Sequence, residues 1–109
     1  MNLKARLLLE SNTTGTEKVN LSVEKNLTVV EPLITQGRTS ASSLELLTTS
    51  GTVMFYVKSV SGTVEVKFDA VSTLALTAGM FALFPVADGI AVELRCSDAV
   101  AEYAYWTLE

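Results

Sequence analysis

Short runs of alternating hydrophobic and polar residues are the main pattern along this chain. Val19, Leu21 and Val23 alternate with polar neighbours, as in a strand that buries one of its faces. Turn-forming residues interrupt such runs about every ten residues. No window of about eleven residues or more has the period of an amphipathic helix. The pattern therefore predicts an all-β protein.

The alternating runs predict about nine or ten short strands. We expect a tight corner at Lys25 and Asn26, between the second and third of them. Many short antiparallel strands are typical of a sandwich, a jelly roll or a small barrel. We favour a jelly-roll-like two-sheet sandwich of about 8–10 strands in a single domain, residues 1–109. The expected strands cover residues 3–9, 18–24, 27–30, 44–49, 52–59, 62–69, 71–77, 80–86, 89–97 and 101–108.

Glycine-containing dipeptides separate the strands of the C-terminal half. They lie at residues 50–51, 61–62, 78–79 and 88–89. Two-residue hairpin turns require a positive φ, which glycine adopts without strain. We therefore expect successive hairpins along this half of the chain.

Residues 31–43 break the alternating pattern. The segment contains Pro32 and Gly37 and ends in a run of serine, threonine and alanine. A loop of this length is either functional or a crossover between sheets. We give equal weight to a docking arm and to a plain crossover. If the segment is an arm, Ile34 and Arg38 are candidate contact residues.

Two expected strands are apolar on both faces. Val53, Phe55 and Val57 share one face of residues 52–59, and Met54 and Tyr56 share the other. Residues 80–84, which begin with Met80, are apolar without alternation. A sandwich strand turns one face inward, so the second apolar face must meet something else. These strands are either covered by a loop or form a subunit interface, for which Met54, Tyr56 and Met80 are candidate residues.

The last expected strand is rich in aromatic residues. Tyr103 and Tyr105 share one face, and Ala104 and Trp106 share the other. Tyrosine and tryptophan are common both in interfaces and in cores. We assign Tyr105 to the candidate interface and expect Trp106 to lie in the core.

Composition and charge exclude several classes of protein. With 49% hydrophobic and 18% charged residues, the 109-residue chain does not resemble a disordered segment. The net charge is −4 and the eight cations are scattered, which argues against nucleic acid or an anionic membrane surface as a partner. The apolar triplet at residues 7–9 is too short for a signal peptide. We therefore expect synthesis in the cytoplasm.

Candidate catalytic chemistry is sparse. The chain has no histidine, and Cys96, its single cysteine, shares parity with apolar residues, so we expect it in the core. Glu65 lies two residues from Lys67, and Glu93 two residues from Arg95, which is typical of solvated strand faces. No Gly-x-Ser-x-Gly elbow or phosphate-binding loop is present. We expect no enzyme activity, no metal and no cofactor.

Residues 57–64, 74–84 and 101–106 resemble segments of small β-rich virion proteins of tailed bacteriophages. The first is similar to a strand and hairpin, the second to two apolar strands around a glycine turn, and the third to a final aromatic strand. The resemblance implies a non-enzymatic capsid decoration (cement) protein in the virion. It also implies self-association, with a homotrimer favoured, and contacts with other virion proteins.

Two alternatives stay open beside capsid decoration. One is a small tail- or fibre-associated virion protein. The other is a carbohydrate- or receptor-binding β module, which requires exposed aromatic rings. Tyr56, Tyr103 and Tyr105 are the candidates for that role, and burial of these rings would count against it.

Overall fold

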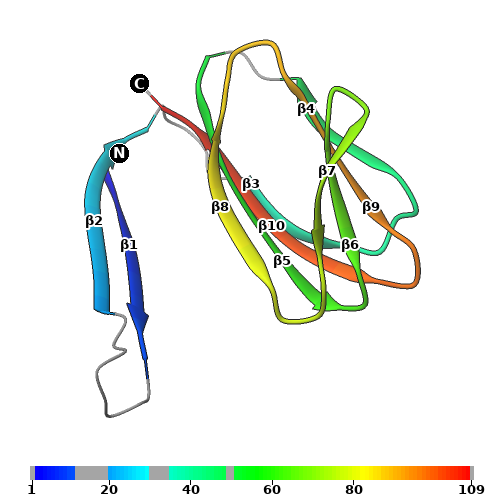
Figure 1. Ribbon diagram of the computed structural model, residues 1–109. Helices are drawn as coiled ribbons and strands as arrows, with labels where there is room; N and C mark the ends of the chain where they lie inside the picture. Colours follow the sequence, from blue (N-terminus) through cyan, green and yellow to red (C-terminus); the bar gives the residue numbers. More distant parts are fainter. Residues whose placement is uncertain (1, 12–19, 30–34, 49–50, 109) are drawn as a thin grey trace.

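A computed structural model describes residues 2–11, 20–29, 35–48 and 51–108, and the strands confirm the predicted all-β class (Figure 1). Strands β1 and β2 form a separate two-stranded sheet, and the other eight form two four-stranded sheets. The strands are β1 (Asn2–Glu10), β2 (Asn20–Thr28), β3 (Thr35–Thr39), β4 (Leu44–Thr48), β5 (Val53–Ser61), β6 (Val64–Phe68), β7 (Val71–Leu76), β8 (Phe81–Val86), β9 (Ala91–Cys96) and β10 (Val100–Thr107).

The eight strands β3–β10 form a jelly roll, as predicted. One sheet has the order β3-β10-β5-β8 and the other the order β4-β9-β6-β7, and every neighbouring pair is antiparallel. The chain is arranged like one long hairpin that has been rolled up, because β3 pairs with β10, β4 with β9, β5 with β8 and β6 with β7. This is the strand pairing of a double-sheet jelly roll.

The core lies between the two sheets, where the predicted alternation turns one face of each strand inward. Val53, Phe55 and Val57 of β5 are buried, whereas their neighbours Met54 and Tyr56 are only half-buried. The Phe55 ring stacks on other rings of its own sheet, and an edge-to-face contact links the two sheets. These ring-centroid distances are 5.6 Å for Phe55–Phe84, 5.8 Å for Phe55–Tyr105 and 5.3 Å for Phe68–Phe84.

The expected glycine turns have the predicted backbone conformation but a different role. Gly51, Gly62, Gly79 and Gly89 all have positive φ. The prediction of successive hairpins is nevertheless wrong, because β5 and β6, β7 and β8, and β8 and β9 lie in opposite sheets. The hairpin between β6 and β7 turns instead at Asp69 and Ala70, whose φ angles are 52° and 64°.

Two other segments differ from the sequence-based expectation. No corner occurs at Lys25 and Asn26, because β2 continues through them and pairs with β1. The expected loop at residues 31–43 contains strand β3, which pairs with β10. Its Gly37 lies under the ring of Tyr103, since a Cβ at this glycine would stand 2.8 Å from the tyrosine oxygen. Residues 30–34, which include the candidate Ile34, are outside the described residues.

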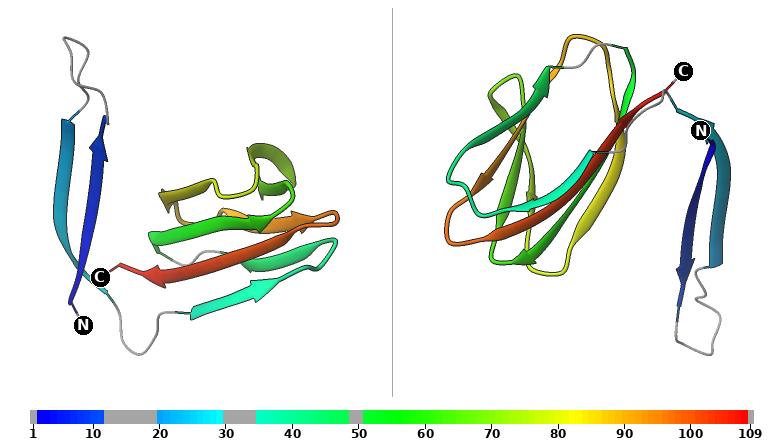
Figure 2. Two further views of the ribbon diagram at one scale, coloured as in Figure 1. Left: turned by 90° about the horizontal axis from the view of Figure 1, so that it is seen from below. Right: turned by 180° about the vertical axis from the view of Figure 1, so that it is seen from behind.

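Strands β1 and β2 form a hairpin that stands beside the sandwich, and we call it the arm (Figures 1 and 2). A single bridge between Val29 and Leu108 joins the chain after β2 to the chain after β10. No strand of the sandwich runs along the arm. The arm therefore projects from the edge of the jelly roll near the C-terminus.

The turn at Gly62 provides a test of this architecture. A Cβ at Gly62 would stand 2.7 Å from the Asp98 carbonyl oxygen and 2.9 Å from the Ala99 Cβ, whereas a Cβ at Gly79 would meet nothing within 4 Å. Both glycines have positive φ, so both alanine substitutions cost about 1–2 kcal/mol of backbone strain. We predict that Gly62→Ala costs about 1–3 kcal/mol more than Gly79→Ala in urea unfolding. Equal losses would contradict the close packing of this turn against the connection from β9 to β10.

Candidate functional site

The two outer faces of the sandwich differ in chemistry. The outer face of the β4-β9-β6-β7 sheet carries charged side chains at the centre, and the outer face of the β3-β10-β5-β8 sheet carries apolar ones. We call the second surface the apolar outer face. An apolar surface on the outside of a protein indicates an interaction site, whereas a charged surface is stable in water.

The charged face places opposite charges side by side, as predicted from the sequence. Glu65 pairs across strands with Arg95, and Lys67 with Glu93. The Arg95 Nε donates a 2.8 Å hydrogen bond to Glu93 Oε1, and the Ser43 hydroxyl donates one of 2.9 Å. The Arg95 and Ser43 hydrogen bonds hold the pKa of Glu93 below its ordinary value. The Glu93 carboxyl is therefore stabilised as a carboxylate.

The apolar outer face is built from three neighbouring strands in register. The cross-strand pairs of β5 with β10 and β8 bring two apolar rows together at its centre. Directly opposite side chains on one sheet face lie close enough to pack together. The rows are Trp106, Met54 and Pro85, and Ala104, Tyr56 and Leu83; a third row of Glu102, Lys58 and Phe81 follows.

The structure brings several of the predicted interface residues to this surface. Met54 and Tyr56 lie in its central rows, and Met80 lies just before β8 with 55% of its surface exposed. Arg38 lies opposite Glu102, and its guanidinium forms a 3.2 Å ion pair with that carboxylate. These four residues are therefore placed on or beside one surface, and their role in an interface stays a prediction.

The predicted sides of the last strand are reversed. Tyr105 points between the sheets and stacks on Phe55, so it lies away from Met54 and Tyr56. Trp106, expected in the core, lies on the apolar outer face opposite Met54. Alternation identifies which residues share a face, and the aromatic stacking on Phe55 decides which face turns inward.

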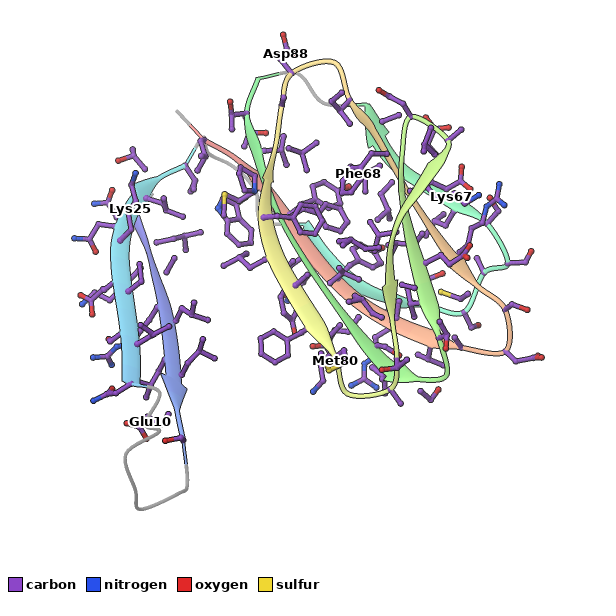
Figure 3. All side chains as sticks on the ribbon, viewed as in Figure 1. Glu10, Lys25, Lys67, Phe68, Met80 and Asp88 are labelled. Carbon is purple, nitrogen blue, oxygen red and sulfur yellow. The ribbon has the colours of Figure 1, made fainter. Side chains whose placement is uncertain are left out.

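The arm presents an apolar face and a polar face. Directly opposite residues of β1 and β2 share a face, so the register collects one set of side chains that is apolar apart from Lys25. In Figure 3 most nitrogen and oxygen atoms drawn on the arm lie on the side away from the sandwich. By register, Lys4 and Glu24 share the polar face, where they form an ion pair at 3.3 Å. The apolar set is Leu3, Ala5, Leu7, Leu9, Leu21, Val23 and Leu27, together with Lys25.

The base of the arm faces the apolar outer face across a cavity of about 460 Å³. Leu3, Ala5 and Leu27 of the arm line the cavity from one side, and Tyr56 and Trp106 from the other. The indole nitrogen of Trp106 is buried there and has no hydrogen-bond partner among the described residues. An unpaired buried donor costs free energy, so the Trp106 indole is an unsatisfied group at the base of the arm.

Two polar groups beside the cavity are affected by burial: the Tyr56 phenol has a raised pKa, and the Trp106 indole has no hydrogen-bond partner among the described residues. Burial raises the pKa of the Tyr56 phenol, and the negative charge of Glu102 raises it further. Tyr56 therefore stays protonated at neutral pH and can donate a hydrogen bond, as can the Trp106 indole. The Tyr56 and Trp106 side chains both line the cavity, so a partner that enters it would contact both of them.

Other chemistry is limited in the described part of the chain. Cys96 is buried in the core, as predicted, and burial raises the pKa of its thiol. Residues 2–11, 20–29, 35–48 and 51–108 contain no group of three or more potential metal ligands. The same residues form no helix that is long and apolar enough to cross a membrane.

Comparisons with known protein families, with curated proteins and with solved structures found no match. The apolar outer face and the arm are therefore the features that bear on function.

Sequence reasoning missed the arm as part of the site. Its strands are predicted correctly over residues 3–9 and 20–24, and the alternation of Leu3, Leu7 and Leu9 with charged residues gives a visible signal. What the pattern does not show is that the two strands pair only with each other, outside the sandwich. Of the two interpretations of residues 31–43, a docking arm or a crossover, the docking arm does not apply to residues 35–39, because they form strand β3 of the sandwich.

Fluorescence of Trp106, the single tryptophan of the chain, tests the contact between the arm and the sheet. Leu27 is buried and lines the cavity with Trp106, so Leu27→Ser will admit water to the indole and shift its emission to longer wavelength. The control is Leu8→Ser, since Leu8 lies on the other face of the arm. An unchanged emission maximum in folded Leu27→Ser would contradict the placement of the arm base over Trp106.

Proposed function

We propose that the protein is a non-enzymatic structural subunit that acts through protein–protein contacts, as a capsid decoration protein of a tailed bacteriophage. The observation that carries this proposal is the one-sided distribution of exposed apolar residues. Ten large hydrophobic residues are exposed in the described part of the chain, and seven of them lie on the apolar face of the arm or at β8. An apolar patch gathered on one side of a molecule is typical of a protein interaction site.

The composition of this surface favours a stable protein–protein interface over a transient interaction driven by charge. Its centre has aromatic and sulfur-containing side chains, Tyr56, Trp106 and Met54, which are enriched at the centres of interfaces. Charges such as the Arg38–Glu102 pair stand at its margin. A central apolar region with a polar rim favours a stable assembly.

The choice of a phage particle rests on the resemblance of residues 57–64, 74–84 and 101–106 to small virion proteins. The jelly roll is compatible with that choice, although the same fold serves unrelated functions. A tail- or fibre-associated protein is the nearest alternative and would use the same surface. The virion location and the other virion proteins as partners belong to this proposal.

A carbohydrate-binding module is less well supported. Tyr103 and Tyr105 pack against the core between the sheets, with a ring-centroid distance of 6.3 Å, which leaves Tyr56 on the outer face. A sugar-binding platform needs aromatic rings exposed together with hydrogen-bonding groups. The placement of two of the three tyrosines therefore favours the structural role.

Co-sedimentation with tailed-phage capsids stripped of their own decoration protein tests the proposal. We predict saturable binding by the wild-type chain, and at least about tenfold weaker binding by Phe81→Lys, because a charge in an apolar contact costs more than about 1.4 kcal/mol. Val71→Lys is the matched control, since Val71 is 65% and Phe81 60% exposed, but Val71 lies on β7 of the other sheet.

Binding to a glycan array without binding to any capsid would overturn the structural role and favour the carbohydrate-binding alternative. Equal losses in Phe81→Lys and Val71→Lys would place the contact elsewhere on the sandwich.

A further inference from the structure

The outer half of the arm carries a large apolar surface that its own chain leaves uncovered. Leu7 is 47%, Leu9 44%, Leu21 56% and Val23 60% exposed, and register places all four on one face. The base of the same face is covered, since Leu27 is only 9% exposed. A two-stranded hairpin is marginally stable by itself in water, so this half of the arm needs another surface to pack on.

A matching surface is exposed on the sandwich. Phe81 and Leu83 point outward from β8 and are 60% and 48% exposed, and Met80 adjoins them. These residues continue the apolar outer face, since Leu83 lies opposite Tyr56 in its central row. Pro85 in the same edge strand lacks an N–H, which disfavours extension of the sheet by another strand. The available contact is therefore face to face through side chains.

The contact at the arm base shows that these two surfaces are compatible. Leu3 and Leu27 already face Tyr56 and Leu83 across the cavity, so an arm-to-sheet contact exists within one chain. The uncovered residues of the arm and of β8 are continuous with this contact on each side. The same pairing of surfaces, extended outward, would cover both remaining patches.

A second copy of the chain supplies both surfaces in equal number. Each copy carries one arm and one apolar outer face, so the number of arms always equals the number of faces on which an arm can pack. Reciprocal exchange between two copies closes as a symmetric dimer, and exchange in one direction closes as a ring where the rotation between copies allows it. No other partner is needed to cover the exposed side chains of the apolar face of the arm and of β8.

We propose that the outer half of the arm of one copy packs on the β8 end of the apolar outer face of a second copy. The contact joins Leu7, Leu9, Leu21 and Val23 of the first copy to Phe81 and Leu83 of the second. This inference goes beyond the proposed function, because it holds for any role in which the protein self-associates.

The two faces of the arm offer a closely matched pair of substitutions. Leu21 and Leu8 are both 56% exposed and lie in the same hairpin, but on opposite faces. Light scattering after size-exclusion chromatography will give a multiple of 11.7 kDa for the wild-type chain and for Leu8→Glu. Leu21→Glu will weaken the association at least tenfold and give a monomer at the same concentration. A wild-type monomer at every concentration would overturn the proposal, and so would a Leu21→Glu protein of unchanged mass.

Disulfide trapping distinguishes exchange between copies from closure of the arm on its own chain. Oxidation of Val23→Cys mixed with Phe81→Cys will give a covalent dimer that contains one chain of each variant. Cys96 is buried, so the wild-type chain serves as the uncrosslinked control. An intrachain disulfide in the Val23→Cys/Phe81→Cys double variant, without covalent dimer, would show that the arm closes on its own sheet and would overturn the proposal.

Discussion

The chain has more apolar strand faces than a two-layer sandwich can enclose, and the rest of the structure depends on this constraint. Two packed sheets bury the inner face of each and leave both outer faces free. The β4-β9-β6-β7 sheet meets this requirement with Glu65, Lys67, Glu93 and Arg95 outside. The β3-β10-β5-β8 sheet instead carries apolar residues on both faces of its central strands. A third layer is therefore required, and the base of the arm supplies part of it.

The aromatic stack inside the sandwich determines which residues this third layer meets. Phe55 lies between Phe84 and Tyr105 within one sheet, and Phe68 of the other sheet contacts Phe84 edge to face. Because alternate side chains point to opposite faces of a strand, these inward rings force Met54 and Trp106 outward. The pairing order of the jelly roll then places β5 and β10 at the centre of their sheet. The apolar outer face is thus a consequence of how the core is packed.

The sequence predicts the fold class and the local elements well because both depend on neighbouring residues. Alternation identifies Val53, Phe55 and Val57 as one face of a strand, and glycine marks the positive φ at Gly62. Neither signal reports on the partner strand. The turn at Gly62 therefore resembles a hairpin in the sequence, although the chain crosses there from one sheet to the other. Strand β3 is not predicted because it contains Gly37, which reads as a loop residue but packs against the Tyr103 ring. Trp106 and Tyr105 exchange their expected sides for the same reason, since tertiary packing decides which face is inside. The arm is visible as two strands but not as a separate layer.

Hydrogen–deuterium exchange at low and high protein concentration tests most directly whether a second copy supplies the rest of the third layer over the apolar outer face. We predict that amides of β1, β2 and β8 exchange more slowly as the concentration rises, because the arm of one copy then covers the β8 face of another. Strand β7, the corresponding edge of the charged sheet, will exchange at the same rate in both samples. Exchange of the arm and β8 that does not depend on concentration would contradict the account.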